Sequence, residues 1–327
     1  MTHNHPILSA VDLTKTYQVS TGTHGRRRLT ALDRVSLQLG SGETVGIAGE
    51  SGCGKSTLAK VLAGLLMADS GTVFYKGTPV AELNSVEARL FRRSTQMIFQ
   101  DPFSSLNPRM RIGDSIREPL IIAGLPPEIQ QRELERHMAA VGLPMDASNR
   151  FPDEFSGGQR QRIGIARALA ASPSILIADE PVSSLDISIQ AQIINILLEM
   201  KREFTLSMVI VSHNLLVLRH LCDRIIIMYL GTIVESGPAE KLFQSCRHPY
   251  TEALIAAIPG IHTAMSGGRE LLQDDIPSPL DLPSGCRFHP RCLHAAHICR
   301  TTPPVLTEYP GHHSTACHRS EELYGVR

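Results

Sequence analysis

Residues 49 to 56 read GESGCGKS, a Gly-x4-Gly-Lys-Ser motif that predicts a loop between a strand and a helix. A run of small residues lets successive backbone N–H groups turn toward one anion. In such a loop Lys55 can reach the outer phosphates of a nucleotide, and the Ser56 hydroxyl can ligate magnesium. A lone match of this kind can also be a chance glycine-rich turn, so its meaning depends on the motifs that follow.

Apolar residues after the motif predict the helix. Leu58, Val61, Leu62 and Leu65 recur at the spacing of one helical face. The N-terminus of this helix would point at the phosphate. We expect the whole loop to contact nucleotide, and its residues are Gly49, Glu50, Ser51, Gly52, Cys53, Gly54, Lys55, Ser56 and Thr57.

A second stretch, ILIADEP, supplies acidic groups for the same site. Residues 175–178 are an unbroken apolar run, typical of a parallel strand buried on both faces. Asp179 ends this run, where a magnesium-binding carboxylate is expected in phosphate-loop enzymes. Glu180 follows and could orient or deprotonate an attacking water. The alternative is a solvated Asp-Glu pair that opens a turn before Pro181.

Between these stretches the chain reads FSGGQRQR, with Ser156, Gly157, Gly158 and Gln159 as its centre. Ser156 is a good N-cap, and the two glycines expose backbone N–H groups at a helix start. With all three motifs in this order, residues 7 to 245 resemble an ABC-type ATPase subunit. The resemblance implies that this signature closes over ATP held by another subunit. Phe155 stands where the family usually has leucine.

The resemblance assigns four further residues. Tyr17 matches the aromatic residue that stacks on adenine, and Gln100 the glutamine that links the magnesium site to the helical subdomain. Asp186 matches the aspartate that reaches across the dimer, and His213 the histidine that contacts the terminal phosphate. From the residues alone, Tyr17 could be an ordinary strand tyrosine, Asp186 a helix N-cap, and His213 a structural histidine.

The predicted fold class is α/β. The resemblance implies a mainly parallel sheet, an antiparallel β subdomain and a helical subdomain at about residues 101–172, all within a nucleotide-binding domain of residues 1–245. The pattern agrees, because residues 7–48 alternate like strands and residues 173–234 alternate strands with helices. Only about a hundred residues separate Lys55 from Ser156, which excludes a long coiled-coil insertion.

Residues 246–327 form a segment rich in proline, histidine and cysteine, which we expect to be a small irregular extension. Its opening RHPYTEALIAAIP, its closing cysteines and the stretch FQDPFSSLNPRM resemble the ATPases of oligopeptide and dipeptide importers. This resemblance implies ATP-driven import, with a second ATPase subunit, two permease subunits and an extracellular solute-binding protein as partners. It places the chain peripherally on the cytoplasmic face of the inner membrane.

Composition limits the alternatives. No stretch approaches 18 consecutive apolar residues, so no spanning helix is expected, and the N-terminus lacks the pattern of a signal peptide. The 32 basic residues balance the 32 acidic ones, which disfavours nucleic acid as a partner. An importer of nickel or another small solute stays open, since related subunits share these motifs.

Four of the seven cysteines, Cys286, Cys292, Cys299 and Cys317, follow the spacing C-x5-C-x6-C-x17-C. A loop-rich segment of this kind often needs a metal to order it. The close C-x2-4-C pairs of zinc sites are absent, so the wider spacing favours an iron–sulfur cluster. The importer family carries a 4Fe-4S cluster in this segment; zinc and unliganded thiols are the alternatives. Because the segment follows all ATP motifs, we expect it to act structurally, without affecting ATP binding.

Overall fold

An eight-stranded sheet forms the centre of the molecule, with strand order β11-β12-β10-β9-β3-β8-β7-β6. The computed structural model describes residues 6–20, 25–101, 105–183, 185–259 and 277–325. The strands from β9 to β6 are parallel, and β10, β12 and β11 continue the sheet in antiparallel pairing. The parallel strands are β3 (Thr44–Ala48), β6 (Thr95–Ile98), β7 (Ile175–Asp179), β8 (Ser207–Val211) and β9 (Arg224–Tyr229).

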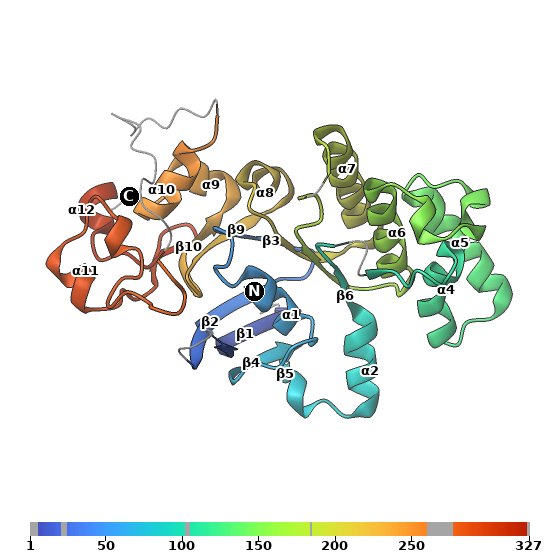
Figure 1. Cartoon of the computed structure of the whole chain (residues 1–327), viewed down its shortest axis with the longest axis horizontal. Coiled ribbons are helices and arrows are strands. Elements are labelled where there is room, and N and C mark those ends of the chain that lie inside the picture. The colour runs from blue at the N-terminus through green and yellow to red at the C-terminus, as the bar shows by residue number, and fades with distance from the viewer. Residues whose placement is uncertain (1–5, 21–24, 102–104, 184, 260–276, 326–327) are drawn as a thin grey trace.

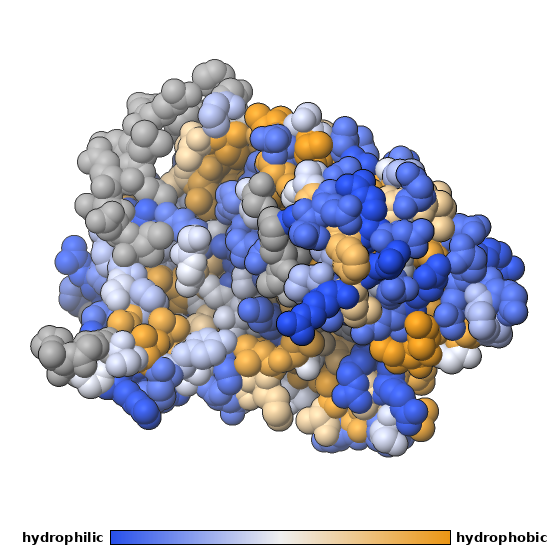
Figure 2. All heavy atoms as spheres, turned by 45° about the vertical axis from the view of Figure 1, so that its right-hand side comes forward, coloured by the Kyte–Doolittle hydropathy of each residue, from blue (hydrophilic) through white to orange (hydrophobic). Residues whose placement is uncertain are grey.

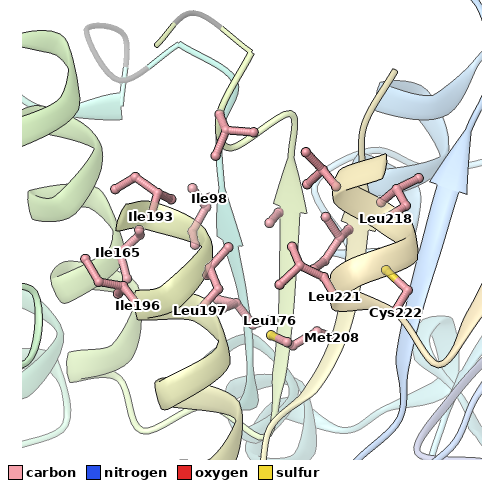
Figure 3. Packing of buried hydrophobic residues seen from close by; sticks show 14 of the residues in the cluster. Ile98, Ile165, Leu176, Ile193, Ile196, Leu197, Met208, Leu218, Leu221 and Cys222 are labelled. Carbon is pink, nitrogen blue, oxygen red and sulfur yellow. The ribbon is translucent and has the colours of Figure 1, made fainter. Parts of the chain in front are cut away.

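Strands β7 and β8 are buried on both faces, as their apolar runs predict. Alternate residues along β7 enter different cores: Ile175 and Ile177 join one cluster, and Leu176 joins the other. Figure 3 shows the second cluster, where Leu197 lies beside Leu176, and Leu218 lies on a different helix near Cys222. Apolar layers therefore cover both faces of the sheet, and the polar side chains of the candidate site lie at the strand ends.

A separate four-stranded antiparallel sheet covers one side, in the order β2-β1-β4-β5. Its inner face shares a core with α1 (Lys55–Leu62). The helix ends before Leu65, which is 59% exposed, so the predicted apolar face is one residue too long. The strands are β1 (Leu8–Ser20), β2 (Arg26–Leu39), β4 (Ser70–Tyr75) and β5 (Thr78–Pro79).

A group of helices, α4, α5 and α6, lies at one end of the long axis, beyond β6 (Figure 1). This helical segment spans the predicted helical subdomain, although residues 102–104 of the FQDPFSSLNPRM stretch are outside the described residues. Its elements are α4 (Ile112–Ile122), α5 (Pro127–Ala140), the 3-10 turns η3 (Met145–Asn149) and η4 (Pro152–Glu154), and α6 (Gly157–Ala170). The remaining helices before residue 246 are η2 (Val80–Glu82), α2 (Ser85–Ser94), α7 (Ile187–Phe204), α8 (Leu215–Leu221) and α9 (Ala239–Gln244).

Residues 246–259 and 277–325, here called the C-terminal segment, lie at the opposite end of the long axis (Figure 1). The segment is less irregular than the sequence predicts, because β12 pairs with β10 (Thr232–Pro238) and so extends the central sheet. This pairing attaches the segment to the central sheet. Its elements are α10 (Pro249–Ala256), η5 (His289–Arg291), α11 (His297–Thr301), β11 (Thr307–Tyr309), β12 (His313–Thr315) and α12 (Ser320–Tyr324).

Candidate functional site

The predicted phosphate loop connects β3 to α1 and is already folded around its lysine. Lys55 is 5% exposed, and its Nζ donates to the carbonyl oxygens of Gly49 at 2.7 Å and Glu50 at 2.9 Å. Gly54 has a φ of 106°, and a Cβ there would lie 2.2 Å from the Ala31 carbonyl oxygen. Glycine is therefore required at this position.

Two oxygen ligands meet at the start of α1. The Ser56 hydroxyl donates to Asp179 Oδ1 at 3.0 Å, which joins the loop to the end of β7. Asp179 is 3% exposed; burial raises the pKa of its carboxyl, which the Ser56 hydrogen bond opposes. Hydroxyl and carboxylate oxygens are donors that suit magnesium, and a cation there would neutralise a carboxylate that is otherwise costly to bury. The residues present fit a bound magnesium ion.

Glu180 lies at the junction of three strand ends. Its φ is 45°, a left-handed conformation that non-glycine residues adopt at a cost and that clusters at functional sites. Its backbone N–H donates to the Val211 carbonyl at 2.9 Å. Its Oε2 lies 3.1 Å from Nδ1 of His213 and accepts from Nε2 of Gln100 at 3.4 Å. The structure thus brings together three side chains that follow separate strands, β6, β7 and β8.

The signature residues lie elsewhere, at the start of α6 in the helical segment (Figure 1). The predicted N-cap is confirmed: Ser156 Oγ accepts from the Gln159 N–H at 3.4 Å, and Gln159 Oε1 accepts from the Ser156 N–H at 3.0 Å. A Cβ on Gly158 would lie 2.6 Å from Ile189 Cγ2 of α7. The signature therefore sits against the start of α7, and only a glycine fits without a shift at Gly158.

Asp186 and Tyr17 are both exposed. Asp186 occupies the N-cap position of α7 without a capping hydrogen bond from its side chain, so capping does not account for the residue. Tyr17 lies on β1, is 38% exposed, and has the Lys15 ammonium 5.8 Å from its ring centroid. Its strand partner is Leu29, two residues from Ala31, which contacts the phosphate loop. The ring is thus available near the loop.

The four spaced cysteines converge. Cys286, Cys292, Cys299 and Cys317 line one small cavity, together with His289 and His294. Burial raises the pKa of the Cys286, Cys292 and Cys317 thiols to about 11. Among the residues that the structure describes, no group of three or more histidine, cysteine or acidic side chains is placed to hold a single metal ion. Thus four thiols share a cavity without surrounding one point.

The remaining cysteines lie apart from this cavity. Cys53 is buried within the phosphate loop, 3.9 Å from the Lys55 Nζ. Cys222 and Cys246 are buried in the main core, where burial raises the pKa of both thiols. The four cysteines that the sequence spacing groups together therefore also lie together in the fold, and the other three lie outside their cavity.

The C-terminal segment contacts the phosphate loop, which its position after the ATP motifs in the sequence did not predict. Arg291, 241 positions beyond Glu50, donates to both carboxylate oxygens of that phosphate-loop residue, at 2.8 Å and 3.1 Å. Nothing in the local sequence marks this contact, because it depends on how the segment folds back along the central sheet. The Arg291–Glu50 pair is the feature of this site that sequence reasoning missed.

A groove separates the helical segment from the sheet. It has a volume of about 770 Å³ and an apolar lining that includes Leu90, Met97, Phe99 and Ile122. Ile122 is 80% exposed. Figure 2 shows apolar side chains gathered among polar ones on this side of the molecule. Met97 belongs to β6 and Phe99 directly precedes Gln100, so the groove wall is continuous with the site around Glu180.

No helix within the described ranges is long and apolar enough to cross a membrane. Residues 32–183 match the ABC transporter family, and residues 234–299 match the oligopeptide/dipeptide transporter C-terminal region.

Curated relatives cover nearly the whole chain. The di/tripeptide transport ATP-binding protein DppF of Pseudomonas aeruginosa strain UCBPP-PA14 is 43% identical over 321 residues, which cover 98% of this chain and 99% of the relative. The dipeptide transport ATP-binding protein DppF of Haemophilus influenzae is 42% identical, over 96% of this chain and 97% of its own length.

A solved structure supports the fold. The ATP-binding cassette MJ0796, as a dimer in a post-hydrolysis state bound to ADP and Pi, superimposes with a TM-score of 0.63 at 29% identity. It covers 71% of this chain and 98% of its own. Together with the folded phosphate loop and the cluster of Gln100, Glu180 and His213, these matches establish the family. The chain belongs to the ATP-binding subunits of ABC transporters of the oligopeptide/dipeptide importer family.

Proposed function

We propose that this protein hydrolyses ATP and couples that energy to the import of dipeptides or oligopeptides through a membrane. The observation that carries the proposal is the convergence of Ser56, Asp179 and Glu180 at one edge of the parallel sheet. The relatives named as dipeptide and di/tripeptide transport proteins support the peptide as solute.

Each site residue has a proposed role. The backbone of the phosphate loop and Lys55 bind the outer phosphates, and Ser56, Asp179 and Gln100 hold magnesium. Bound magnesium would neutralise phosphate charge and orient the terminal phosphate. Glu180 accepts a proton from the attacking water, because its carboxylate is fixed at the strand edge by its neighbours. His213 contacts the terminal phosphate, and the exposed ring of Tyr17 stacks on adenine.

A complete site requires two chains. The Ser156–Gln159 signature and Asp186 lie against α7 rather than in the phosphate loop, and their exposed helix N-terminus is suited to a phosphate. We propose that this end of one chain covers the ATP bound to a second ATPase subunit, which is a related chain or a copy of this one. The dimer of the MJ0796 cassette is a precedent for such an arrangement.

The other proposed partners are two permease subunits and an extracellular solute-binding protein, with the ATPase on the cytoplasmic face of the inner membrane. The apolar groove beside β6 is the proposed permease contact, and its occupant would be a short helix with an apolar face. Exposed Ile122 and the continuity of the groove wall with Gln100 support this assignment. A permease helix there could sense the state of Glu180.

We also propose that Cys286, Cys292, Cys299 and Cys317 bind a 4Fe-4S cluster. Four thiolates around one zinc ion would hold their sulfur atoms within about 4 Å of one another. The cysteines line one cavity, and their spacing lacks the close pairs of zinc sites, which favours a larger inorganic core. A cluster held there would order a segment that has little core of its own.

The proposed domain division follows from these roles. Residues 1–245 form the nucleotide-binding domain, with the helical subdomain at about 101–172, and residues 246–327 form the C-terminal extension with the four cysteines. Pairing of β12 with β10 supports a firm attachment of the two.

Reconstitution tests the function. The chain should be purified with its permease subunits, placed in vesicles with the solute-binding protein, and supplied with ATP and labelled dipeptides. We expect ATP-dependent uptake and ATP turnover that rises with peptide. Uptake of nickel with no response to any di- or oligopeptide would overturn the assignment of the solute.

A further inference from the structure

Glu50 carries a negative charge inside the loop that binds phosphate. A free carboxylate at this position would repel the nucleotide, because like charges a few ångströms apart disfavour each other even near a protein surface. In the structure this carboxylate is paired with Arg291, whose two terminal nitrogens donate to its two oxygens at 2.8 Å and 3.1 Å. The Arg291 side chain is 5% exposed and that of Glu50 is 22% exposed. Two parallel hydrogen bonds of this kind hold the guanidinium and the carboxylate in one relative orientation.

The same segment also holds the backbone of Glu50. The Glu50 N–H donates to the Tyr250 hydroxyl at 3.0 Å. Tyr250 is fully buried, and its ring lies 4.7 Å from that of Tyr229 and 5.3 Å from that of Phe288. Phe288 is 2% exposed and belongs to the turn that precedes Arg291. Both the side chain and the amide of Glu50 are therefore fixed by residues of the C-terminal segment.

A further contact supports the loop from its other side. The guanidinium of Arg287 donates to the Leu230 carbonyl and to the Asp33 carboxylate. Next to Leu230, the Gly231 N–H donates to the carbonyl of Cys53 in the phosphate loop at 2.9 Å. The C-terminal segment thus supports the loop at Glu50 directly and at Cys53 through Gly231.

We propose that Arg291 is a positioning residue for nucleotide binding: it neutralises Glu50 and turns its carboxylate away from the phosphates. The C-terminal segment then completes the phosphate loop and is not only an appended domain. Burial disfavours the charged form of Arg291, but its hydrogen bonds to Glu50 and Tyr229 and its attraction to the Glu50 charge together raise the pKa of the guanidinium above its usual value. Arg291 touches neither ATP nor the reacting atoms in this account.

The proposal predicts a specific pattern among three variants. Arg291→Met removes the positive charge and leaves Glu50 unpaired, so the Kd for ATP should rise about tenfold. Glu50→Gln is the background for comparison, because it removes the carboxylate and keeps the size of the side chain. In this background Arg291→Met should change the Kd for ATP by no more than about twofold, since no carboxylate is left to repel the nucleotide. If Arg291 only stabilised the fold, adding Glu50→Gln would not restore the ATP affinity that Arg291→Met loses.

The test measures ATP binding by calorimetry on the full chain, and KM and kcat on the intact complex. KM should rise in Arg291→Met with kcat within about twofold of the parent. Arg291→Lys keeps the charge but loses the fork, so it should give an intermediate Kd and covers the case in which Arg291→Met fails to fold. Arg219→Met, which removes another two-bond arginine–carboxylate pair far from the loop, is the matched control and should leave Kd unchanged.

Two results would overturn the proposal. One is parental ATP affinity in both Arg291→Met and Arg291→Lys. The other is a double variant that binds ATP as weakly as Arg291→Met, which would place the effect in the fold of the segment instead of the charge of Glu50. A loss of affinity that Glu50→Gln reverses supports the proposal whatever the solute of the complex is.

Discussion

The hydroxyl of Ser56 donates a 3.0 Å hydrogen bond to the carboxylate of Asp179, although 123 positions separate the two residues. This bond joins the first turn of α1 to the end of β7, so the helix start and the strand end present two oxygen atoms to the same place. Both elements are anchored in the core, α1 by one apolar cluster and β7 by both. The core thus fixes the positions of both oxygens.

The first prediction concerns magnesium. Asp179→Asn keeps the size of the side chain but removes its charge, so the magnesium concentration for half-maximal ATP turnover should rise about tenfold or more. Turnover of the intact complex titrated with magnesium at saturating ATP measures this. An Asn variant with the parental magnesium curve would show that Asp179 is not a ligand.

A second prediction concerns pairing of the ATPase subunits. Gly157→Asp would place a carboxylate at the signature helix start, where it favours the helix in the single chain but opposes a phosphate of the partner's ATP. We expect this variant to fold, to bind ATP and to fail to dimerise with ATP in sedimentation experiments.

Gly157→Ala is the matched control. A Cβ at Gly157 would meet Leu185 at an ordinary 3.7 Å, whereas a Cβ at Gly158 would strike Ile189 at 2.6 Å and confound the test. The alanine variant should dimerise like the parent. Equal ATP-dependent pairing of the aspartate variant would argue against a composite site.

The third prediction concerns the cysteine cavity. Protein purified without oxygen should be brown and contain about four irons per chain. Serine at Cys286, Cys292, Cys299 or Cys317 should remove the colour, whereas serine at the buried Cys222 or Cys246 should not. Arg291 stands between Cys286 and Cys292 in the sequence and pairs with Glu50 of the phosphate loop. Loss of the cluster should therefore displace Arg291 and weaken ATP binding.

Two outcomes of metal analysis would correct this prediction in different ways. A colourless preparation with one zinc per chain would replace the cluster with a structural ion. Four freely titrating thiols without stoichiometric metal would remove both. Optical spectra, metal content and thiol titration of the same sample distinguish the three states.

A fourth prediction follows from His248. Burial lowers its pKa from the usual 6.5 to about 3, and its Nδ1 accepts the Tyr250 N–H at the start of α10. As pH falls below 6.5 the unfolded chain takes up a proton at this residue while the folded chain does not. The contribution of His248 to the free energy of unfolding is therefore fully present above pH 6.5. It is lost progressively as the pH falls toward 3, by at most about 1.4 kcal/mol per pH unit.

His248→Asn isolates that effect, because asparagine can also cap α10 but does not titrate. The free energy of unfolding in urea should be measured at pH 7.5 and 5.5 for both proteins. The parent should lose about 1.4 kcal/mol more than the variant over this interval. An equal loss in both would show that His248 is not the group responsible.

The sequence predicts the local parts of the site well. The loop around Lys55, the strand end at Asp179 and the cap at Ser156 each depend on neighbours within a few positions, and each has the expected geometry. The helix after the loop stops short of Leu65 because that residue faces the groove instead of the core.

Contacts between residues that are far apart in the sequence could not be predicted in this way. Arg291 pairs with Glu50 only because β12 adds to β10 and carries the C-terminal segment back toward the phosphate loop. Two short strands with no marked periodicity decide that placement. The side-chain pattern near Arg291 contains no trace of its partner, so the role of the segment became apparent only in the fold.

The most direct test of the account is ATP turnover and peptide uptake by the reconstituted complex with Glu180→Gln. Glutamine keeps the shape and the strained backbone position but cannot take the proton, so hydrolysis should fall roughly 10²–10⁴-fold and uptake should fall with it, while ATP stays bound. Lys55→Ala, in contrast, should lose nucleotide itself. Hydrolysis at the parental rate in the glutamine variant would contradict the assignment of Glu180 and with it the proposed mechanism.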